Sequence, residues 1–148
     1  RTKMPDAFIG VDVIVGSRGE TPDLFEKSYS FIEGLDISQL HVFSYSERSG
    51  TQALSIDYIV KPTDKRMRHF RLQQLSDKKW KAFYERHTGK KVNVLFEQAS
   101  VEGLMHGFSE NYIRVEVPYK KEWINKVVPV QLGSFNMDGT ALMGIPLI

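Results

Sequence analysis

The sequence of 148 residues contains no cysteine. This absence excludes disulfide bonds, a thiol nucleophile, zinc knuckles and an iron–sulfur cluster held by cysteines of this chain. The sequence also has no apolar run long enough to span a membrane and no basic-then-apolar leader. We therefore expect a cytoplasmic protein without a membrane partner. Because the chain starts at Arg1 without a methionine, we expect it to be a piece of a longer protein.

A net charge of only +2 conceals a segregated charge pattern. Residues 1–63 hold 6 basic and 9 acidic side chains, residues 64–91 hold 10 and 3, and residues 92–148 hold 4 and 6. A basic band between two acidic blocks is expected where one face meets a polyanion such as nucleic acid. It is equally expected of a long, solvated, basic helix. Charge alone leaves both interpretations open.

The first part of the chain predicts a strand–helix–strand unit. Residues 8–15 are apolar and rich in β-branched side chains, which is typical of a strand buried on both faces of a parallel sheet. A tight loop at 16–20 follows, and Thr21 can cap a helix that Gly34 ends in a left-handed conformation. Residues 40–45 form a second short strand, parallel to the first.

A long helix is predicted from Pro62 to about His87, with Gly89 as its stop signal. Most of the basic band lies on the part of the helix that does not face a core. The predicted core positions are apolar, and they include Met67, Phe70, Leu75, Trp80, Phe83 and Tyr84.

From Lys91 onward the apolar period changes from 3.6 to 2, which indicates about five short strands. We predict a small closed antiparallel barrel of the OB type. The fold class is thus α/β plus all-β, with domains at 1–88 and 89–148. Glycines separate the apolar runs at positions 103, 107, 133, 139 and 144.

A loop, a carboxylate and the four histidines are the candidates for chemistry outside the barrel segment. The loop from Gly16 to Gly19 could bind an anion with its amides, but it lacks the phosphate-loop and dinucleotide signatures, so a plain turn is the commoner explanation. Asp12 in a buried strand needs a partner or a wet cavity. Strand alternation places Asp12, Ile14 and Gly16 on one side. The four histidines show no metal-ligand spacing, and no Ser–His–Asp arrangement is evident.

The segment from Phe108 to Arg114 combines aromatic, amide and guanidinium groups near a turn. On a small barrel such groups can stack bases and contact phosphates, although an ordinary hairpin with a core aromatic is the alternative. Together with nearby lysines, this gives a candidate RNA-binding set of Lys90, Lys91, Phe108, Asn111, Tyr112, Arg114, Lys120 and Lys121.

Four segments together resemble one enzyme family. Residues 12–21 and 43–53 resemble the closing half of the radical S-adenosylmethionine methylthiotransferases. Residues 89–94 and 107–117 look like the RNA-binding TRAM barrel that ends those enzymes. The resemblance covers nearly the whole chain, and its two motif groups stand in the family's order on either side of a basic helix.

The resemblance implies the end of an open radical S-adenosylmethionine barrel, a connecting helix and a TRAM domain. The family converts a C–H bond to C–SCH₃, most often on a modified adenosine beside the tRNA anticodon, using S-adenosylmethionine and [4Fe–4S] clusters. We expect a carboxyl-terminal fragment that is inactive by itself and holds neither cofactor. Its expected partners are a tRNA anticodon stem-loop, the missing cluster-binding domains and, through edge strands, a second copy.

By the same resemblance, Ile14, Gly16, Phe43 and Tyr45 would lie along the adenosine part of the cofactor, with Asp12 facing the cavity. Arg48 and Thr51 would lie at the cavity mouth, near cofactor or substrate. The sequence departs from the family pattern at Ser17–Arg18, usually Phe-Pro, and at Glu47 and Ser49, where prolines are common.

The segment from Leu40 to Phe43 is most similar to the enzymes that act on threonylcarbamoyladenosine. The isopentenyl-adenosine group is next, and the group that modifies a ribosomal protein is less similar. Two alternatives from other classes remain: a stand-alone RNA-binding adaptor without catalytic activity, and a protein-interaction module.

Overall fold

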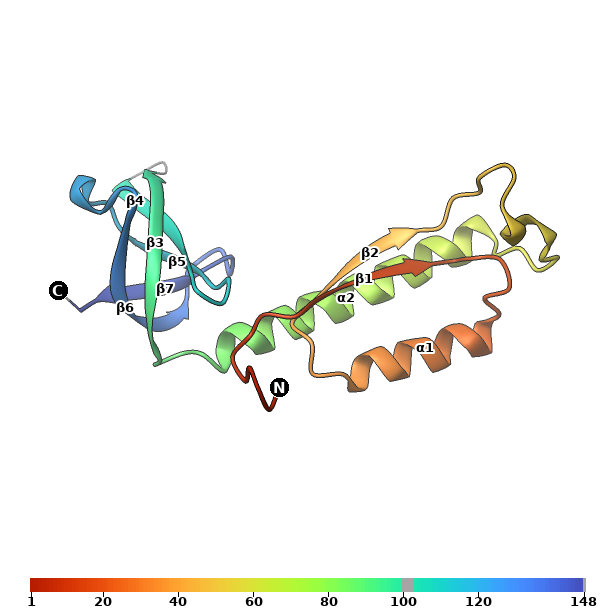
Figure 1. The fold of residues 1–148 in the computed structure, drawn as a ribbon, viewed down its shortest axis with the longest axis horizontal. Coiled ribbons are helices and arrows are strands. Elements are labelled where there is room, and N and C mark those ends of the chain that lie inside the picture. The colour runs from red at the N-terminus through yellow and green to blue at the C-terminus, as the bar shows by residue number, and fades with distance from the viewer. Residues whose placement is uncertain (100–102, 148) are drawn as a thin grey trace. The chain divides into compact units, whose positions relative to one another are not determined.

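A computed structural model describes residues 1–99 and 103–147 (Figure 1). The chain divides into two compact units. The β/α unit comprises residues 9–81, and the barrel unit comprises residues 1–8 together with the chain from Ala82 onward. The expected first domain, residues 1–88, differs from the β/α unit at both ends. Residues 1–8 and 82–88 belong to the barrel unit instead. No helix among the described residues is long and apolar enough to cross a membrane.

The β/α unit contains strand β1 (Gly10–Val15), helix α1 (Pro22–Gly34) and strand β2 (Gln39–Ser44). The two strands are parallel, with Val11 opposite Leu40 and Ile14 opposite Phe43. The predicted strand–helix–strand order is confirmed. Beyond β2, the chain forms a short 3₁₀ helix, η1 (Gln52–Ser55), and then helix α2 (Pro62–Glu85).

Helix α1 begins and ends where the sequence predicts, but the interaction that ends it is not the predicted one. The Thr21 hydroxyl accepts a hydrogen bond from the Leu24 amide at 3.4 Å, as expected of a cap. Gly34 does not adopt a left-handed conformation. Instead Leu35 is extended, and its amide donates to the carbonyl of Ile32. The left-handed cap is therefore a wrong prediction.

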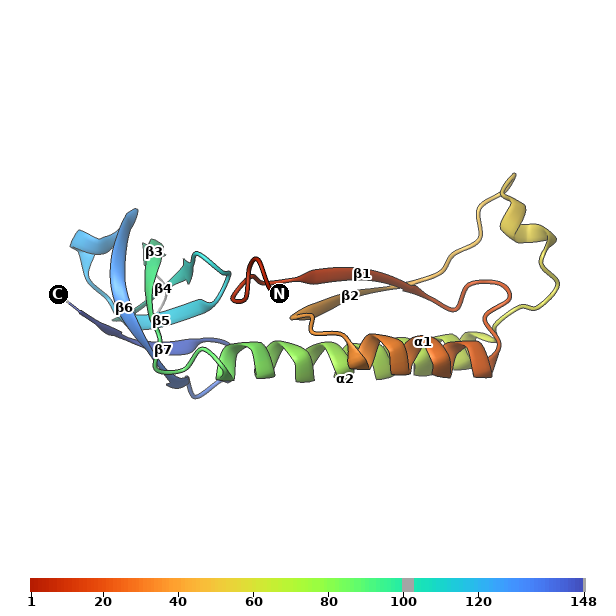
Figure 2. The same ribbon diagram turned by 60° about the horizontal axis from the view of Figure 1, so that its bottom comes forward.

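Both helices cover the same face of the two-stranded sheet (Figure 2). Their shared core contains Val15, Phe25, Leu40, Leu72 and Leu75. The opposite face is open, because within residues 1–99 and 103–147 the sheet has only two strands and no helix packs there. Accordingly, the prediction that β1 is buried on both faces is wrong.

Two predicted core positions of α2 are also exposed. Met67 is 55% and Phe70 is 61% exposed, whereas Leu72 and Leu75 are buried. The helical period allows more than one apolar stripe, and the sheet contacts only one of them.

The barrel unit contains five strands in the closed order β3-β4-β5-β7-β6, and a 3₁₀ helix, η3, precedes β6. Four neighbouring pairs are antiparallel, and β5–β7 is parallel. The small closed barrel is confirmed, but a wholly antiparallel one is wrong, because an odd number of alternating strands around a ring leaves one parallel pair. The bounds are β3 (Lys91–Ala99), β4 (Leu104–Ser109), β5 (Arg114–Pro118), η3 (Lys121–Trp123), β6 (Lys126–Phe135) and β7 (Leu142–Pro146).

Alternate residues of these strands fill the barrel, and Val94, Phe96, Val115 and Val130 are completely buried. Some glycines that the sequence suggests as separators lie inside strands. A Cβ at Gly144 in β7 would lie 2.6–2.8 Å from methyl groups of three valines on β5 and β6. This glycine therefore lets the strands approach each other rather than turn the chain.

Candidate functional site

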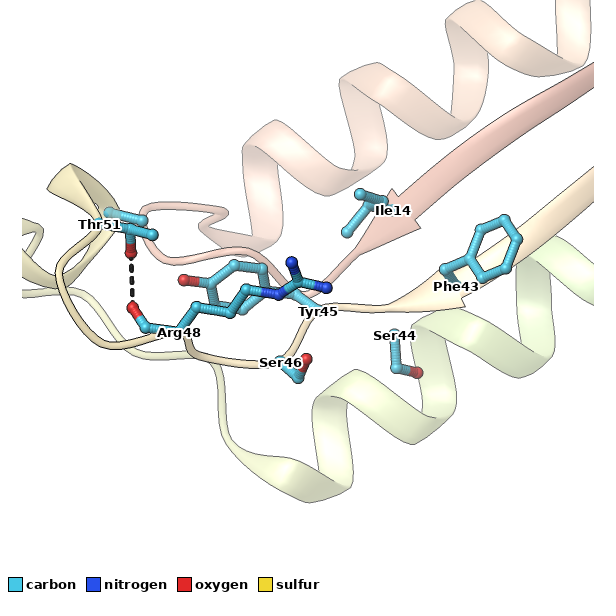
Figure 3. A pocket seen from close by; sticks show the side chains of 8 residues that line it. Ile14, Phe43, Ser44, Tyr45, Ser46, Arg48 and Thr51 are labelled. Carbon is cyan, nitrogen blue, oxygen red and sulfur yellow. Dashed lines mark hydrogen bonds between the residues drawn. The ribbon is translucent and has the colours of Figure 1, made fainter.

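The β/α unit has a hollow of about 430 Å³ at the carboxyl ends of β1 and β2 (Figure 3). Ligands of α/β proteins commonly bind beyond the carboxyl ends of parallel strands, since side chains of neighbouring strands and loops converge there. The hollow is lined by Ile14, Phe43, Ser44, Tyr45, Ser46, Arg48, Thr51 and Ala53.

Its apolar part comes from the strand register. Ile14 and Phe43 are opposite each other in the parallel ladder and point to the uncovered face, where they are 60% and 52% exposed. The Tyr45 amide donates to the Val15 carbonyl at 2.9 Å, which extends the pairing by one residue. The Lys65 ammonium donates to the Tyr45 carbonyl and lies 5.5 Å from the centre of its ring. These contacts hold three apolar side chains at one end of the sheet.

Its polar part comes from the loop after β2. The Thr51 hydroxyl donates to the Arg48 carbonyl at 2.9 Å, which closes a tight turn (Figure 3). The Arg48 side chain extends from this turn toward the strand ends. Within the part of the chain that the structure describes, no hydrogen bond or ion pair engages its guanidinium. An exposed guanidinium beside apolar and hydroxyl groups suits a ligand with a flat apolar part and an anionic part.

The structure brings five of the seven sequence-predicted cavity residues into this hollow: Ile14, Phe43, Tyr45, Arg48 and Thr51. Asp12 lies on the same exposed face but outside the hollow, with a side chain 77% exposed and a carboxylate 3.5 Å from the His41 imidazole. Asp12 is therefore not a buried carboxylate, because no element of the described chain covers that face.

Gly16 is also outside the hollow. It occupies the turn after β1 with φ +79°, and its amide donates to the Glu20 carboxylate at 2.8 Å. The same carboxylate binds the buried Arg68 at 2.7 Å. The Gly16 amide is bonded to Glu20 and is therefore not available to an external anion. The loop from Gly16 to Gly19 thus acts as a plain turn, which is the commoner of the two explanations given for it above.

Sequence reasoning did not single out Ser44, Ser46 and Ala53 as lining residues. Ser46 follows Tyr45 in the loop and Ala53 lies further along it, whereas the Ser44 hydroxyl lies 3.2 Å from Nδ1 of His69. All three stand inside the motif of residues 43–53, so the motif as a whole carried the signal.

Many basic side chains of residues 64–91 form contacts within the protein. The sequence interpretations, a face for a polyanion or a solvated helix, did not include such contacts. Lys79 donates to the carbonyls of Glu33 and Leu35 at 2.9 and 2.7 Å, and burial lowers the pKa of its ammonium. Arg71 forms a two-point contact with Glu26, and its hydrogen bond lowers the pKa of that carboxyl. At least six of the ten basic residues in 64–91 have such partners, among them Lys65, Arg68, Arg71, Lys78, Lys79 and Lys90.

The barrel unit presents an outward row across four adjacent strands. Val127, Leu95 and Phe108 are neighbours in register and are 63%, 43% and 45% exposed. Arg114 stands opposite Phe108 on β5. A hollow of about 530 Å³ covers most of this row, and its lining consists of Asn93, Leu95, Glu97, Phe108, Ser109, Glu110, Tyr112 and Val127.

Three of the predicted RNA-binding residues instead hold the first residues of the chain. Lys90 forms an ion pair with Asp6 at 2.8 Å, and this hydrogen bond lowers the pKa of the Asp6 carboxyl. The Asn111 amide donates to the Asp6 carbonyl at 3.1 Å. The Tyr112 ring centre lies 6.4 Å from that of Phe8.

The remaining predicted residues lie at both ends of the barrel. Lys91 begins β3, at the end where Phe108 pairs with Arg114. Lys120 and Lys121 follow Pro118, at the other end of β5. Pro118 is four residues along the strand from Arg114, a distance of roughly 13 Å. The Lys120 ammonium lies 4.4 Å from the centre of the Trp123 ring. The predicted set is therefore not one continuous patch.

Neither unit offers a ligand set for a metal cluster. The chain contains no cysteine, and among residues 1–99 and 103–147 no group of three or more His, Asp or Glu is arranged to hold a metal ion.

Comparison with known proteins finds no matching family model. Threonylcarbamoyladenosine tRNA methylthiotransferase MtaB of Bacillus subtilis is 32% identical over 133 residues, which is 87% of this chain and 30% of that protein. The tRNA-2-methylthio-N(6)-dimethylallyladenosine synthase of Symbiobacterium thermophilum is 29% identical over 94% of this chain and 31% of its own length. The MtaB protein of Aquifex aeolicus is 33% identical over 85% of this chain and 29% of its own length. The chain thus spans about three tenths of these curated relatives.

Proposed function

We propose that this chain, which belongs to the tRNA methylthiotransferase family, is the carboxyl-terminal portion of such an enzyme. The enzyme would act in the cytoplasm on a modified adenosine beside a tRNA anticodon. The segment from Leu40 to Phe43 favours threonylcarbamoyladenosine as the modified base, while relatives of both kinds are similar to this chain. The single observation that carries the proposal is the hollow that gathers Ile14, Phe43, Tyr45, Arg48 and Thr51.

The hollow fits the adenosine part of S-adenosylmethionine. A volume of about 430 Å³ lies within the range of small-molecule sites, and three apolar side chains line one part of it. When bound, S-adenosylmethionine supplies the methyl group and the radical chemistry of the reaction. The [4Fe–4S] clusters do not fit this chain, which has no thiolate to hold them, so other parts of the enzyme would bind them.

The residues of this chain would bind and orient rather than react. Ile14, Phe43 and Tyr45 would pack against the planar base and exclude water from one side of it. The Arg48 guanidinium would bind a carboxylate or phosphate oxygen. Thr51 would keep Arg48 in place through its hydrogen bond to the Arg48 carbonyl.

The barrel unit would serve as the TRAM domain and bind the anticodon stem-loop. Phe108 offers an exposed ring for stacking, and Arg114 stands next to it on the neighbouring strand. Lys91 is exposed at the same end of the barrel and would contact phosphate. Lys90 contributes less than the sequence predicts, because Asp6 neutralises it.

A gel-shift titration against a tRNA anticodon stem-loop tests the RNA part of this proposal. Binding should weaken as salt increases, because phosphate contacts release counterions. Replacing both Lys91 and Arg114 by alanine should reduce affinity about tenfold and lower the salt slope by about two. The matched control is Lys27→Ala, an exposed basic residue on α1. Salt-independent binding, or equal losses in the control, would count against an RNA-binding barrel.

A further inference from the structure

Arg18 makes an unusually dense set of contacts for a surface-loop residue. It lies in the turn after β1, and its side chain is 16% exposed. Its Nε and Nη2 atoms both bind one carboxylate oxygen of Glu47 at 2.7 Å. Its Nη1 atom donates to the carbonyls of Leu54 and Ile56 at 2.9 and 3.1 Å. One guanidinium therefore binds three separate points of the segment from Glu47 to Ile56.

That segment carries the polar side of the candidate cofactor hollow. Its own hydrogen bonds are local: Thr51 to Arg48, the Leu54 amide to Thr51 and the Ile56 amide to Ala53. Local bonds of this kind shape a turn but do not attach it to the sheet. Arg18 supplies that attachment from the end of β1, and the nearby Gly19 amide adds a 2.9 Å bond to the Tyr58 carbonyl.

We propose that Arg18 is a positioning residue that fixes the segment from Glu47 to Ile56, and with it Arg48 and Thr51, over the cofactor hollow. Its effect on ligand affinity rests on the function proposed above, whereas its effect on the segment does not. Arginine suits this role because its planar fork can donate to a carboxylate and to carbonyls at the same time, which a lysine ammonium does with poorer geometry. Arg18 would determine how well the hollow holds the anionic part of an adenosine-containing ligand.

The first experiment measures amide hydrogen exchange at Leu54 and Ile56 in the 148-residue chain. Arg18→Ala should speed exchange at both amides by roughly 10- to 100-fold, because charge-assisted hydrogen bonds to the segment are lost. Arg18→Lys should recover little of the protection. The matched control is Arg66→Ala, an exposed arginine in the same unit. The Leu40 amide, which donates to Ser76, should be unchanged in all variants and shows that the unit still folds.

Charge reversal separates a positioning contact from general loop stability. Arg18→Glu alone places two carboxylates together and should speed exchange further. Combining it with Glu47→Arg restores the ion pair but not the two carbonyl contacts, so protection should return in part. Unchanged exchange in Arg18→Ala, or no recovery in the reversed pair, would overturn the proposal.

The second experiment measures equilibrium binding of S-adenosylmethionine to the full-length protein that carries this segment. Arg18→Ala should raise the Kd about tenfold, and the reversed pair should lower it again. Failure of the two ideas is distinguishable. If the unaltered protein does not bind S-adenosylmethionine, the proposed cofactor site is wrong while the exchange data still decide the role of Arg18. Equal Kd values despite faster exchange would show that Arg18 orders the segment without affecting the ligand.

Discussion

The two units bury their apolar residues in different ways. In the barrel unit every strand has two neighbours, and the ladder closes on itself around a buried centre that includes Phe96 and Val130. In the β/α unit two strands are covered on one face, and the other face exposes Ile14 and Phe43. A closed barrel leaves no free edge, whereas a short open sheet needs further support.

That support is polar in the β/α unit. The buried Arg68 binds the carboxylate and the carbonyl of Glu20, both at 2.7 Å. The buried Ser76 hydroxyl binds both the amide and the carbonyl of Leu40 at 2.9 Å. Charged and hydroxyl groups of α2 thus attach the sheet and its loops to this helix. Basic side chains of α2 therefore serve the architecture of the unit wherever the helix faces the sheet and its loops.

The largest expected effect is the loss of barrel packing. Phe96 is completely buried, and its ring centre lies 6.1 Å from that of Trp123. Phe96→Ala should lower the free energy of unfolding of the barrel by about 3–5 kcal/mol. Native-state hydrogen exchange at Val94 and Val130, compared with Val13, measures this loss unit by unit.

Phe70→Ala is the matched control, since this ring is 61% exposed. It should change stability by about 1 kcal/mol or less. Equal losses of protection in both units after Phe96→Ala would show that the two units unfold as one and do not depend on separate cores.

The next largest effect concerns the polar support of the β/α unit. Arg68→Met removes a charge that is 96% buried at the side chain and leaves Glu20 without its partner. The expected loss is about 2–3 kcal/mol, below that of a fully buried pair because Glu20 keeps some access to water. Urea unfolding checks it.

Glu20→Gln keeps the hydrogen-bonding shape of the Glu20 side chain and should cost less than Arg68→Met. If both changes left the urea midpoint unaltered, polar anchoring would not hold this unit.

A smaller, pH-dependent effect is expected where residues 1–8 meet the rest of the barrel unit. The hydrogen bond from Lys90, above all other causes, lowers the pKa of Asp6 below its ordinary value of 3.8. A carboxyl with a lowered pKa in the folded state stabilises the protein above its ordinary pKa, and this contribution is lost as the pH falls through the folded value. Carboxyl NMR titration should show the Asp6 pKa rising in Lys90→Met. The charge-matched control Lys91→Met should leave it unchanged, and an equal rise in both variants would refute the specific pairing.

The smallest effect is expected on the open face of the sheet. Phe43→Ser alters a ring that is 52% exposed and should change the melting temperature little, corresponding to about 1 kcal/mol or less. A loss as large as that of Phe96→Ala would mean that something covers this face in solution. Concentration-dependent melting would then identify a second copy as the molecule that covers this face.

Local patterns in the sequence were sufficient for most of the elements. Thr21 and Pro22 mark the start of α1. Pro62 marks the start of α2, and Gly89 lies in the turn that follows its end. Period-two alternation places Val94, Phe96 and Val130 inside a small barrel. These signals are predictable because they depend on neighbours within a few residues.

The candidate site was predictable only in part. Ile14, Phe43, Tyr45, Arg48 and Thr51 converge as the motif resemblance implies, but Asp12 and Gly16 do not join them. Whether a strand face is covered depends on distant elements, and whether an amide is available depends on a side chain such as Glu20. Neither condition has a local sequence signal.

By itself, then, the sequence determined the order of helices and strands, the closed barrel, the family resemblance and the lack of cluster ligands. Only the tertiary structure decided how the charges of residues 64–91 are used. It paired Arg68 with Glu20, Arg71 with Glu26 and Lys90 with Asp6, across separations of 45 to 84 residues. Coulomb energy depends on distance in space and on burial, and composition contains neither.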